Sequence, residues 1–292
     1  MLGSANMDLV VRQARRPAAG ETVFGTSFST GPGGKGLNQT IAAARAGAEV
    51  AFIGAVGDDE YGARLRARME ADGVDVGRLS TVSAPTGTAH ISVTDDGENT
   101  IVVVPGANAE TRLTAEDRAA IAAASYLLVQ LERPIELIVE AMRLARDSDV
   151  TTVLTPAPVR ADLAEVLALA DVLIPNEGEA LLLGGAADAE SAAVALSRIV
   201  DTVIVTLGPR GALLAQRGAL VRAVAPHVAT ALDTTGAGDT FVGVLAAWLA
   251  GGAGIDAALE AASAAAAVTV TREGAADAMP TRREIEARLR RS

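Results

Sequence analysis

The chain has 292 residues, of which 25 are basic and 36 acidic, giving a formal net charge of −11 at pH 7. This negative charge and an aromatic content of only 2% argue against a nucleic-acid partner, because phosphates are repelled and bases lack stacking platforms. The absence of cysteine excludes disulfides and thiolate metal sites, and two histidines argue against a histidine-rich metal centre. No stretch predicts a signal peptide or a membrane span, so we expect a cytoplasmic protein without a membrane partner.

Apolar, strand-like runs alternate with helical patterns along most of the chain. The predicted strands are 50–56, 126–131, 150–154, 171–176 and 202–208. The predicted helices are 37–46, 60–72, 134–147, 161–169 and 188–199, with Asp188 as the N-cap of the last. This alternation predicts an α/β fold of three layers, in which helices cover both faces of a mainly parallel sheet.

Two segments interrupt the alternation, because 21–30 and 88–104 have strand character without a helix between strands. In the second segment, DDGEN is typical of a turn that joins the strands of a hairpin. We expect strands within about 9–30 and 86–105 to form a small β-sheet lid over one end of the main sheet. No linker divides the chain, so we expect a single domain that spans 1–292.

Several polar or glycine-rich stretches follow the predicted strands directly. Ligands of an open parallel sheet bind at the carboxyl ends of its strands. The stretches that we expect to line one cleft are 57–59, 132–133, 155–158, 175–179 and 207–211.

The stretch GPGGKG at 31–36 contains Lys35, the only lysine of the chain. It matches the dinucleotide pattern G-x-G-x-x-G, but it does not follow the first strand of a βαβ unit, and a glycine follows the lysine where a Walker loop needs Ser or Thr. The bare backbone, Lys35 and Asn38 suit a ligand with hydroxyls and phosphate charge. A glycine turn that merely opens a helix explains the stretch equally well.

Two other motifs have both a functional and a structural interpretation. In GSANMD, Asn6 and Asp8 lie on one face of an extended chain and suit a diol, although an Asx turn is the commoner reason for such a pair. In PNEGE, Asn176 and Glu179 could organise Mg²⁺ through its waters, or could simply form a capping box.

The stretch DTTGAGDTF at 233–241 is more specific. Gly236 and Gly238 allow successive amides to point at one spot beside a helix start, which makes a hole for an anion such as a transferring phosphoryl group. Asp239 cannot bind that anion, but it can accept the proton of an approaching hydroxyl.

GSANMD, GPGGKGLNQ, AFIGAVGDDEYG, PNEGE, TLGPRGA and DTTGAGDTFVG occur in the order and at about the spacing found in the ribokinase family of ATP-dependent sugar kinases. The resemblance covers essentially the whole chain. It implies a ribokinase-like fold, ATP with Mg²⁺ and K⁺ as cofactors, a small-molecule sugar as substrate, and a homodimer formed through the β lid.

The resemblance also implies roles for individual residues. Asp239 is the base that deprotonates the attacking hydroxyl, and the amides of Gly236, Ala237 and Gly238 form the anion hole. The residues expected to hold the sugar are Asn6, Asp8, Gly34, Lys35, Asn38, Glu132 and Asp239. Those expected to face ATP are Asn176, Glu179, Thr206, Gly208, Gly211, Gly238 and Ser263, with Glu179 in the Mg²⁺ region. The loop expected to bind K⁺ consists of Asp233, Thr235, Thr269, Arg272, Gly274 and Ala278.

Four positions depart from the family pattern. Only two residues precede GSANMD, so most of the family's first strand is expected to be absent. Thr155 stands where an asparagine is usual, and Ser263 replaces a bulkier polar residue near the adenine. Ala278 stands where many members offer a serine to K⁺, so we expect weaker potassium binding.

QLE at 130–132 and TPAP at 155–158 favour members of the family that convert D-ribose to D-ribose 5-phosphate. Alternative acceptors are deoxyribose, fructose, adenosine or pseudouridine. A sugar or nucleotide sensor without catalysis is a second class of function. An NAD-dependent enzyme is a third, and it depends only on the G-x-G-x-x-G match.

Overall fold

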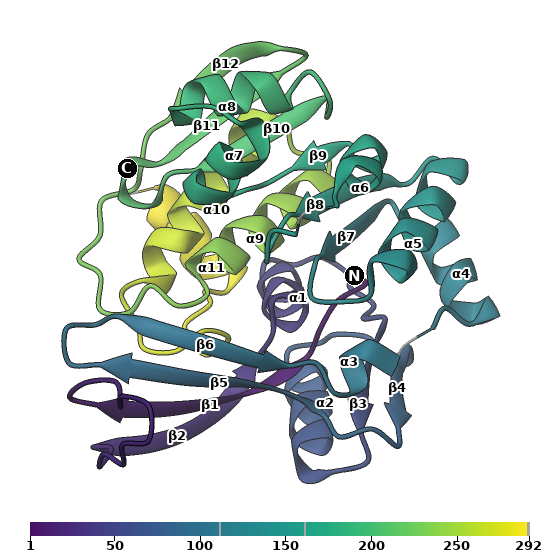
Figure 1. Ribbon diagram of the computed structural model, residues 1–292. Helices are drawn as coiled ribbons and strands as arrows, with labels where there is room; N and C mark the ends of the chain where they lie inside the picture. The colour runs from purple at the N-terminus through teal and green to yellow at the C-terminus, as the bar shows by residue number, and fades with distance from the viewer. Residues whose placement is uncertain (111, 161, 291–292) are drawn as a thin grey trace.

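A twisted sheet lies at the centre of the molecule with helices on both faces, in the computed structural model of this chain (Figure 1). The structure describes residues 1–110, 112–160 and 162–290. The sheet has the order β12–β11–β10–β9–β8–β7, in which β7 to β10 are parallel and β11 and β12 are antiparallel. The strands are β7 Tyr126–Gln130, β8 Thr151–Thr155, β9 Val172–Leu173, β10 Thr202–Thr206, β11 Ala212–Gln216 and β12 Ala219–Val224.

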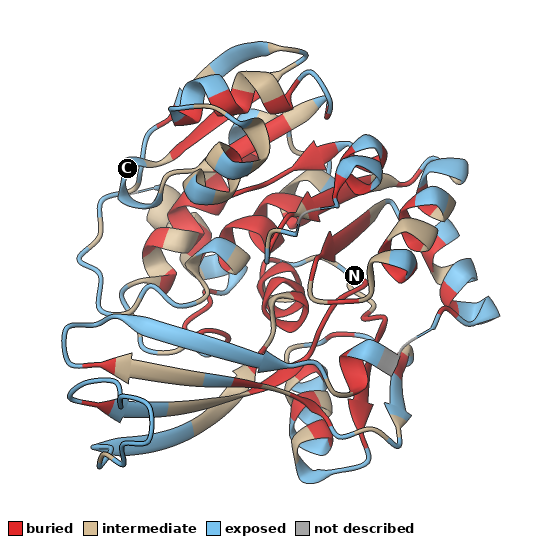
Figure 2. Cartoon of the chain, viewed as in Figure 1, coloured by how far each residue is buried: buried red, intermediate tan, exposed pale blue. Residues whose placement is uncertain are grey.

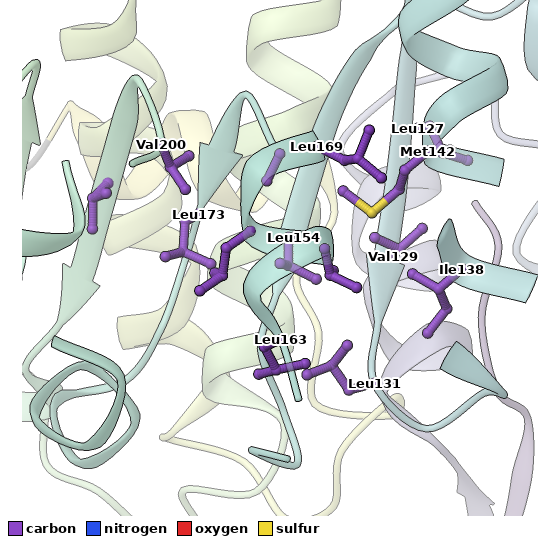
Figure 3. Close-up of a cluster of buried hydrophobic side chains, with 14 of the residues drawn as sticks. Leu127, Val129, Leu131, Ile138, Met142, Leu154, Leu163, Leu169, Leu173 and Val200 are labelled. Carbon is purple, nitrogen blue, oxygen red and sulfur yellow. The ribbon is translucent and has the colours of Figure 1, made fainter. Parts of the chain in front are cut away.

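Successive residues of the central strands pack into different layers, because side chains of a strand alternate between its two faces. Leu127 and Val129 belong to the cluster beneath one helical layer, whereas Leu128 packs with helices of the other layer. Figure 3 shows the first cluster, in which Ile138 and Met142 meet the strand residues. The three-layer α/β/α prediction is therefore confirmed.

The helices divide between the two faces of the sheet (Figure 1). The first layer contains α4 Ala115–Ala122, α5 Ile135–Asp147, α6 Ala164–Leu169, α7 Glu177–Gly184 and α8 Ala189–Leu196, which Asp188 caps as predicted. The second layer contains α1 Lys35–Arg45, α9 Ala237–Ala250, α10 Ile255–Thr269 and α11 Arg282–Leu289. Two short helical segments, α3 Ala107–Glu110 and the 3-10 turn Gly208–Arg210, connect other elements.

Leu2 joins the main sheet to a second, short parallel pair. It forms single bridges with Val129 on one side and Ile53 on the other. The short pair consists of β3 Gly54–Gly57 and β4 Leu79–Val82, and α2 Glu60–Ala71 packs on it. The residues that follow Leu2 thereby lead from the main sheet into β1 of the lid.

The small β-sheet lid is present as a separate sheet of order β2–β1–β5–β6. Its strands are β1 Asn6–Gln13, β2 Ser27–Gly33, β5 Gly87–Thr94 and β6 Asn99–Val104. The DDGEN turn closes the β5–β6 hairpin, where the Thr94 N–H donates to the carbonyl of Glu98 at 3.0 Å. Figure 2 shows that β6 is exposed along its length.

Three predicted strands begin or end several residues away from the observed ones. The 50–56 strand forms only from Gly54, because Ala51 and Ile53 make single bridges rather than a continuous ladder. The 171–176 strand shortens to β9, and the 21–30 strand forms only from Ser27, after a glycine-containing loop held by Arg15 and Glu21. The predicted helix 161–169 begins outside the described residues, and the helix itself begins at Ala164.

Within the described ranges, no helix combines the length and the apolar character that crossing a membrane requires.

Candidate active site

The glycines of GPGGKG allow α1 to begin directly against the start of β1. A Cβ on Gly36 would lie 2.5 Å from the Ser4 nitrogen, and a Cβ on Gly33 would lie 2.2 Å from an Asp8 carboxylate oxygen. Gly34 has a φ of +90°, which side-chain-bearing residues rarely adopt. These glycines therefore make room for protein atoms rather than for a ligand. They place Lys35 beside Asp8.

Lys35 lies among four carboxylates that come from four different elements. Asp8 belongs to β1, Glu132 follows β7, Glu179 is in α7, and Asp239 is in α9; each acts electrostatically on the ammonium. Burial lowers the pKa of Lys35, but the four negative charges outweigh burial and leave the pKa above its ordinary value. Elements that are distant in the sequence thus bring their predicted residues to one point.

The four carboxylates of this cluster repel one another, because the single ammonium of Lys35 cannot neutralise all of their negative charge. Burial, reinforced by the charges of Glu132 and Asp239, raises the pKa of Asp8 to about 7. Glu132 is held by the backbone N–H of Lys35 at 3.0 Å and by the hydroxyl of Ser4. The cluster therefore holds negative charge that a polar ligand with hydroxyl donors would stabilise.

Asp239 lies in the first turn of α9, immediately after the glycines that were predicted to form an anion hole. Gly236 adopts a left-handed conformation with φ +74°, and a Cβ there would lie 3.0 Å from Ala275 Cα. A Cβ on Gly238 would meet no atom within 4 Å, so the backbone there borders open space. Burial raises the pKa of Asp239, against the opposing charge of Lys35.

A cavity of about 470 Å³ adjoins this turn on the other side. Its walls are mainly apolar and include Phe241, Ala266 and Val270. Of the residues expected to face ATP, it brings together Thr206, Gly208, Gly211, Gly238 and Ser263. Asn176 does not line the cavity, but it pairs with Thr206 through a parallel bridge at its rim.

Asn176 and Glu179 form the capping box of α7. The Asn176 side chain accepts from the Glu179 N–H at 2.9 Å, and the Glu179 carboxylate accepts from the Asn176 N–H at 2.8 Å. The structural interpretation of PNEGE is therefore correct, but Glu179 also acts on Lys35 and Asp239 electrostatically. Burial raises the pKa of Glu179, and one of its oxygens remains outside the cap bond.

The loop expected to bind K⁺ is assembled around Asp233. One carboxylate oxygen accepts from the Thr235 N–H at 2.9 Å, and the other accepts from the Gly274 N–H at 2.9 Å. These bonds hold the pKa of Asp233 below its ordinary value although partial burial raises it. The Thr269 carbonyl accepts a hydrogen bond from the Arg272 N–H at 3.0 Å, and the carbonyl of the buried Ala278 accepts one from the Arg272 guanidinium.

The groups of side chains and backbone atoms around the site suit different ions and ligands. Among the described residues, no three His, Cys, Asp or Glu side chains form a cluster able to bind a metal ion by themselves. A single carboxylate such as that of Glu179 suits Mg²⁺, which keeps most of its water ligands, and the Asp233 carboxylate suits a monovalent cation. The mainly apolar cavity beside an open Gly238 backbone suits a base with its phosphate chain.

Four polar residues around the site were not predicted. Gln39 donates to Asp239 at 3.0 Å, and Gln130 donates to Gln39 at 2.6 Å. Asn108 donates to the Asn6 side chain at 2.8 Å and accepts from the Ala5 N–H at 3.0 Å, and Ser4 holds Glu132. Gln39 and Gln130 stand within the quoted stretches GPGGKGLNQ and QLE, but nothing local indicates that they meet.

The comparisons with known proteins agree with this geometry. The model of the pfkB family carbohydrate kinases matches residues 1–282. The chain is 39% identical to the ribokinase of Haemophilus influenzae, covering 97% of this chain and 95% of the relative. It is 40% identical to the ribokinase of Bacillus subtilis, covering 98% and 97%.

Two solved structures share the fold over nearly their whole length. The ribokinase of Thermotoga maritima superposes with a TM-score of 0.92 at 34% identity, covering 99% of this chain and 98% of that one. The Arabidopsis thaliana ribokinase complexed with ribose and ATP gives 0.93 at 30% identity, covering 100% and 98%. The resemblance inferred from the motifs is confirmed, and the chain belongs to the pfkB family of carbohydrate kinases.

Proposed function

We propose that this carbohydrate kinase transfers the γ-phosphate of ATP to D-ribose and forms D-ribose 5-phosphate. The observation that carries the proposal is the junction at the start of α9. Gly238 lines the cavity of about 470 Å³, whereas the next residue, Asp239, belongs to the acidic cluster around Lys35. One helix start therefore separates a nucleotide-sized cavity from a polar site, as direct transfer between two bound substrates requires.

Ribose is the proposed acceptor because the ribokinases that this chain resembles act on it, and the Arabidopsis protein was solved with ribose and ATP. The polar site also offers acceptors for hydroxyl groups. Within the described part of the chain, the Oδ1 atom of Asn38 is buried and has no hydrogen-bond partner. A sugar hydroxyl would satisfy this oxygen, and Asp8 and Glu132 offer further acceptors beside it.

In the proposed reaction, Asp239 accepts the proton of the ribose 5-hydroxyl while that oxygen bonds to the γ-phosphorus. The bond from this phosphorus to the bridging oxygen breaks, and ADP leaves. The start of α9 at Gly236, Ala237 and Gly238 directs the positive end of the helix dipole toward the transferring group, and Lys35 supplies further positive charge. Bound ATP with Mg²⁺ supplies the phosphoryl group and neutralises part of its charge, with Glu179 as the nearby carboxylate.

We further propose a potassium site at Asp233, Thr235 and the carbonyls of 269–274, which brace the loop before the anion hole. The contact between Arg272 and the Ala278 carbonyl supports a weak site. The Arg272 guanidinium already donates to this carbonyl, which K⁺ would otherwise be able to use as a ligand. Activity in KCl is expected to exceed activity in choline chloride by only a few fold. Equal activity in the two salts would contradict this site.

We also propose a homodimer formed through the lid. Along β6, Ile101, Val102, Val103 and Val104 are each at least 43% exposed, and Phe28 of β2 is 64% exposed. Such a row of apolar side chains on one sheet is typical of a surface that another chain covers. Replacing Val102 and Val104 with threonine is expected to convert a dimer to a monomer in size-exclusion chromatography with light scattering.

A coupled assay of ADP release over a panel of sugars and nucleosides tests the proposed activity. Ribose is expected to give the highest kcat/KM, above deoxyribose, fructose, adenosine and pseudouridine. A higher value for another acceptor would reassign the substrate but keep the kinase. Binding of ribose and ATP without release of ADP for any acceptor would indicate a sensor instead.

Asp239→Asn tests the assigned base. The substitution is expected to lower kcat by a factor of about 10³ or more, because a positioned base contributes factors of this size and the anion hole remains. Binding of a non-hydrolysable ATP analogue, measured by calorimetry, should change little. Asp147→Asn, at the exposed end of α5, is the matched control and should behave like the wild-type protein.

A further inference from the structure

Two neighbouring carboxamides at the start of α1 hold the two oxygens of the Asp239 carboxylate. Asn38 Nδ2 donates to one oxygen at 3.1 Å, and Gln39 Nε2 donates to the other at 3.0 Å. Gln39 is completely buried. An ionised carboxylate has room for about four hydrogen bonds, so these two restrict its rotation and leave capacity for a hydroxyl donor.

Gln39 reaches Asp239 because α1 and α9 pack unusually closely. Gly243 lies one turn after Asp239, and a Cβ there would be 2.4 Å from the Gln39 carbonyl oxygen and 2.7 Å from the Ala42 Cβ. Any side chain at Gly243 would force the helices apart. The close approach thus places the Gln39 amide at hydrogen-bonding distance from the carboxylate of the facing helix.

The orientation of the Gln39 amide is itself determined by two strand ends. Its oxygen accepts from Gln130 Nε2 of β7 at 2.6 Å, and its nitrogen also donates to the Thr155 hydroxyl of β8 at 3.2 Å. The Gln130 donor turns the Gln39 oxygen away from Asp239, so the amide nitrogen faces the carboxylate. All these side chains are fixed by the sheet before any substrate arrives.

We propose that Gln39 is a positioning residue, which fixes the rotation of the Asp239 carboxylate, and that Gln130 and Thr155 set the direction of the Gln39 amide. The inference deepens the proposed kinase function, because it concerns the proton acceptor of the same site. It also gives Thr155 a role, because its hydroxyl accepts a second hydrogen bond from the Gln39 amide nitrogen.

A donor to Asp239 also favours its charged form. The charged groups that face Asp239 are Lys35 from α1, Glu132 beyond β7, Glu179 from α7 and Asp8 from β1. Lys35 and the two amides lower the pKa of Asp239, whereas burial and the other carboxylates raise it. Removing the Gln39 donor leaves the carboxylate less stabilised, so it should bind its proton more tightly.

The test compares Gln39→Met with the wild-type enzyme over a range of pH. Methionine keeps the length of the side chain and removes both the oxygen and the nitrogen of the carboxamide. We expect kcat to fall at least tenfold with little change in the KM for the sugar, and the acidic limb of the kcat/KM profile to move upward by roughly one pH unit. Gln130→Met should give a smaller shift in the same direction, because it only releases the Gln39 amide.

Gln216→Met is the matched control, because Gln216 also donates one side-chain hydrogen bond, to Thr202 at 3.0 Å, but lies on β11 away from Asp239. It should leave the profile unchanged. If Gln39→Met lowers activity but its pH profile coincides with that of the wild type, the residue is only structural and the proposal is wrong.

A second measurement does not depend on turnover. The pKa of Asp239 is read by carbon NMR of protein labelled at the aspartate carboxyl carbons, with the resonance assigned by its absence in Asp239→Asn. A higher pKa in Gln39→Met supports the inference even if no sugar is phosphorylated, which separates its failure from failure of the proposed function. An unchanged pKa overturns it.

Discussion

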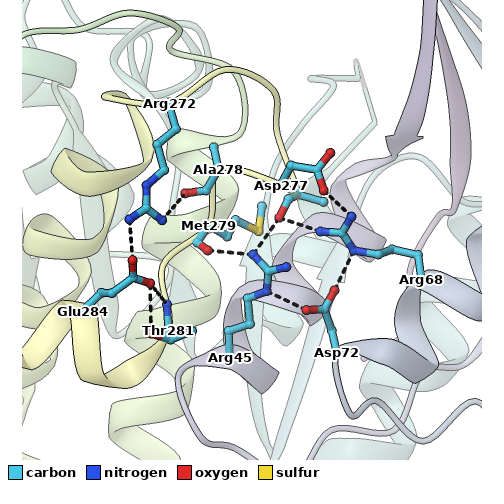
Figure 4. A network of polar contacts seen from close by, with 10 residues as sticks. Arg45, Arg68, Asp72, Arg272, Asp277, Ala278, Met279, Thr281 and Glu284 are labelled. Atoms are coloured by element: carbon cyan, nitrogen blue, oxygen red, sulfur yellow. Dashed lines mark hydrogen bonds and ion pairs between the residues drawn. The ribbon is translucent and has the colours of Figure 1, made fainter.

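Two charged clusters lie at opposite ends of α1, and they differ in the balance between acidic and basic side chains. At its start, the single ammonium of Lys35 faces the carboxylates of Asp8, Glu132, Glu179 and Asp239. At its end, Arg45 and Arg68 share the carboxylate of Asp72, and Arg68 also pairs with Asp277 (Figure 4). The first cluster has more acids than bases, whereas in the second each acid has a guanidinium partner.

The hydrogen bonds of the two clusters differ in the same way. Arg45 and Arg68 use their remaining donors on the carbonyls of Ala276 and Met279, so the cluster ties α1 and α2 to the turn before α11. At the other end, burial raises the pKa of Asp8 to about 7, and the buried Asn38 Oδ1 has no hydrogen-bond partner among the described residues. We conclude that the arginine cluster stabilises the fold, and that the lysine cluster keeps unfavourable charge that a ligand can relieve.

Lys35→Met removes the ammonium of the lysine cluster and is expected to reduce activity about as strongly as Asp239→Asn. Without the ammonium, the pKa values of Asp8 and Asp239 should rise further, and the transferring phosphoryl group should lose a positive neighbour. We expect kcat/KM for the sugar to fall by a factor of about 10³, as for loss of a charged group in a preorganised site. A loss below tenfold in the coupled assay would mean that the cluster functions without its cation.

Local patterns predicted the elements that are continuous in the sequence. β7, β8 and β10 fall within about two residues of the expected ranges, because the central residues of each strand are buried on both faces of the sheet. The glycine-rich turns were also recognisable, since Gly34 and Gly236 have a backbone conformation that other residues rarely adopt.

The contacts around Asp239 could not be predicted in the same way. Gln39 and Gln130 are 91 residues apart, and the hydrogen bond from Gln39 to Asp239 depends on the approach that Gly243 permits between α1 and α9. The predicted strands that begin at Val50 and Glu21 begin too early, because strand propensity does not reveal whether a neighbouring strand continues alongside. Contacts between distant segments determine these hydrogen bonds and strand boundaries. A single sequence indicates such contacts only where it contains a recognisable motif.

Asp72→Asn should break the arginine cluster and lower stability. The side chain is 10% exposed and accepts from Arg45 at 2.6 Å and from Arg68 at 2.7 Å, so an amide would turn a donor toward a guanidinium. We expect a loss of about 3 kcal/mol in the free energy of unfolding, as for one partner removed from a largely buried pair. Urea denaturation measures it, and a change under 1 kcal/mol would refute the structural role of this cluster.

Asp8→Asn should raise the free energy of unfolding, unlike Asp72→Asn, because it removes repulsion between carboxylates in the lysine cluster. Since the folded pKa of about 7 lies above the ordinary value of 3.8, the folded protein binds more protons between these values and loses stability as pH rises. The variant avoids that loss. We expect it to be more stable than the wild type by about 2 kcal/mol at pH 8 and by less than half of that at pH 5.

The measurement for Asp8→Asn is urea denaturation at both pH values, together with the KM for the sugar. A raised KM alongside the gained stability would show that the acidic cluster sacrifices stability for binding. Equal stability of the two proteins at pH 8 would contradict the charge assignment.

Arg143→Ala should have the smallest effect and calibrates the other variants. Arg143 pairs with Glu165 between α5 and α6, but the two side chains are 63% and 54% exposed. Water screens such a pair, so its removal should change the free energy of unfolding by about 0.5 kcal/mol or less and leave kcat/KM unchanged. A loss comparable to that of Asp72→Asn in the same urea experiment would mean that pairing alone, rather than burial of the paired carboxylate, decides which charges stabilise this fold.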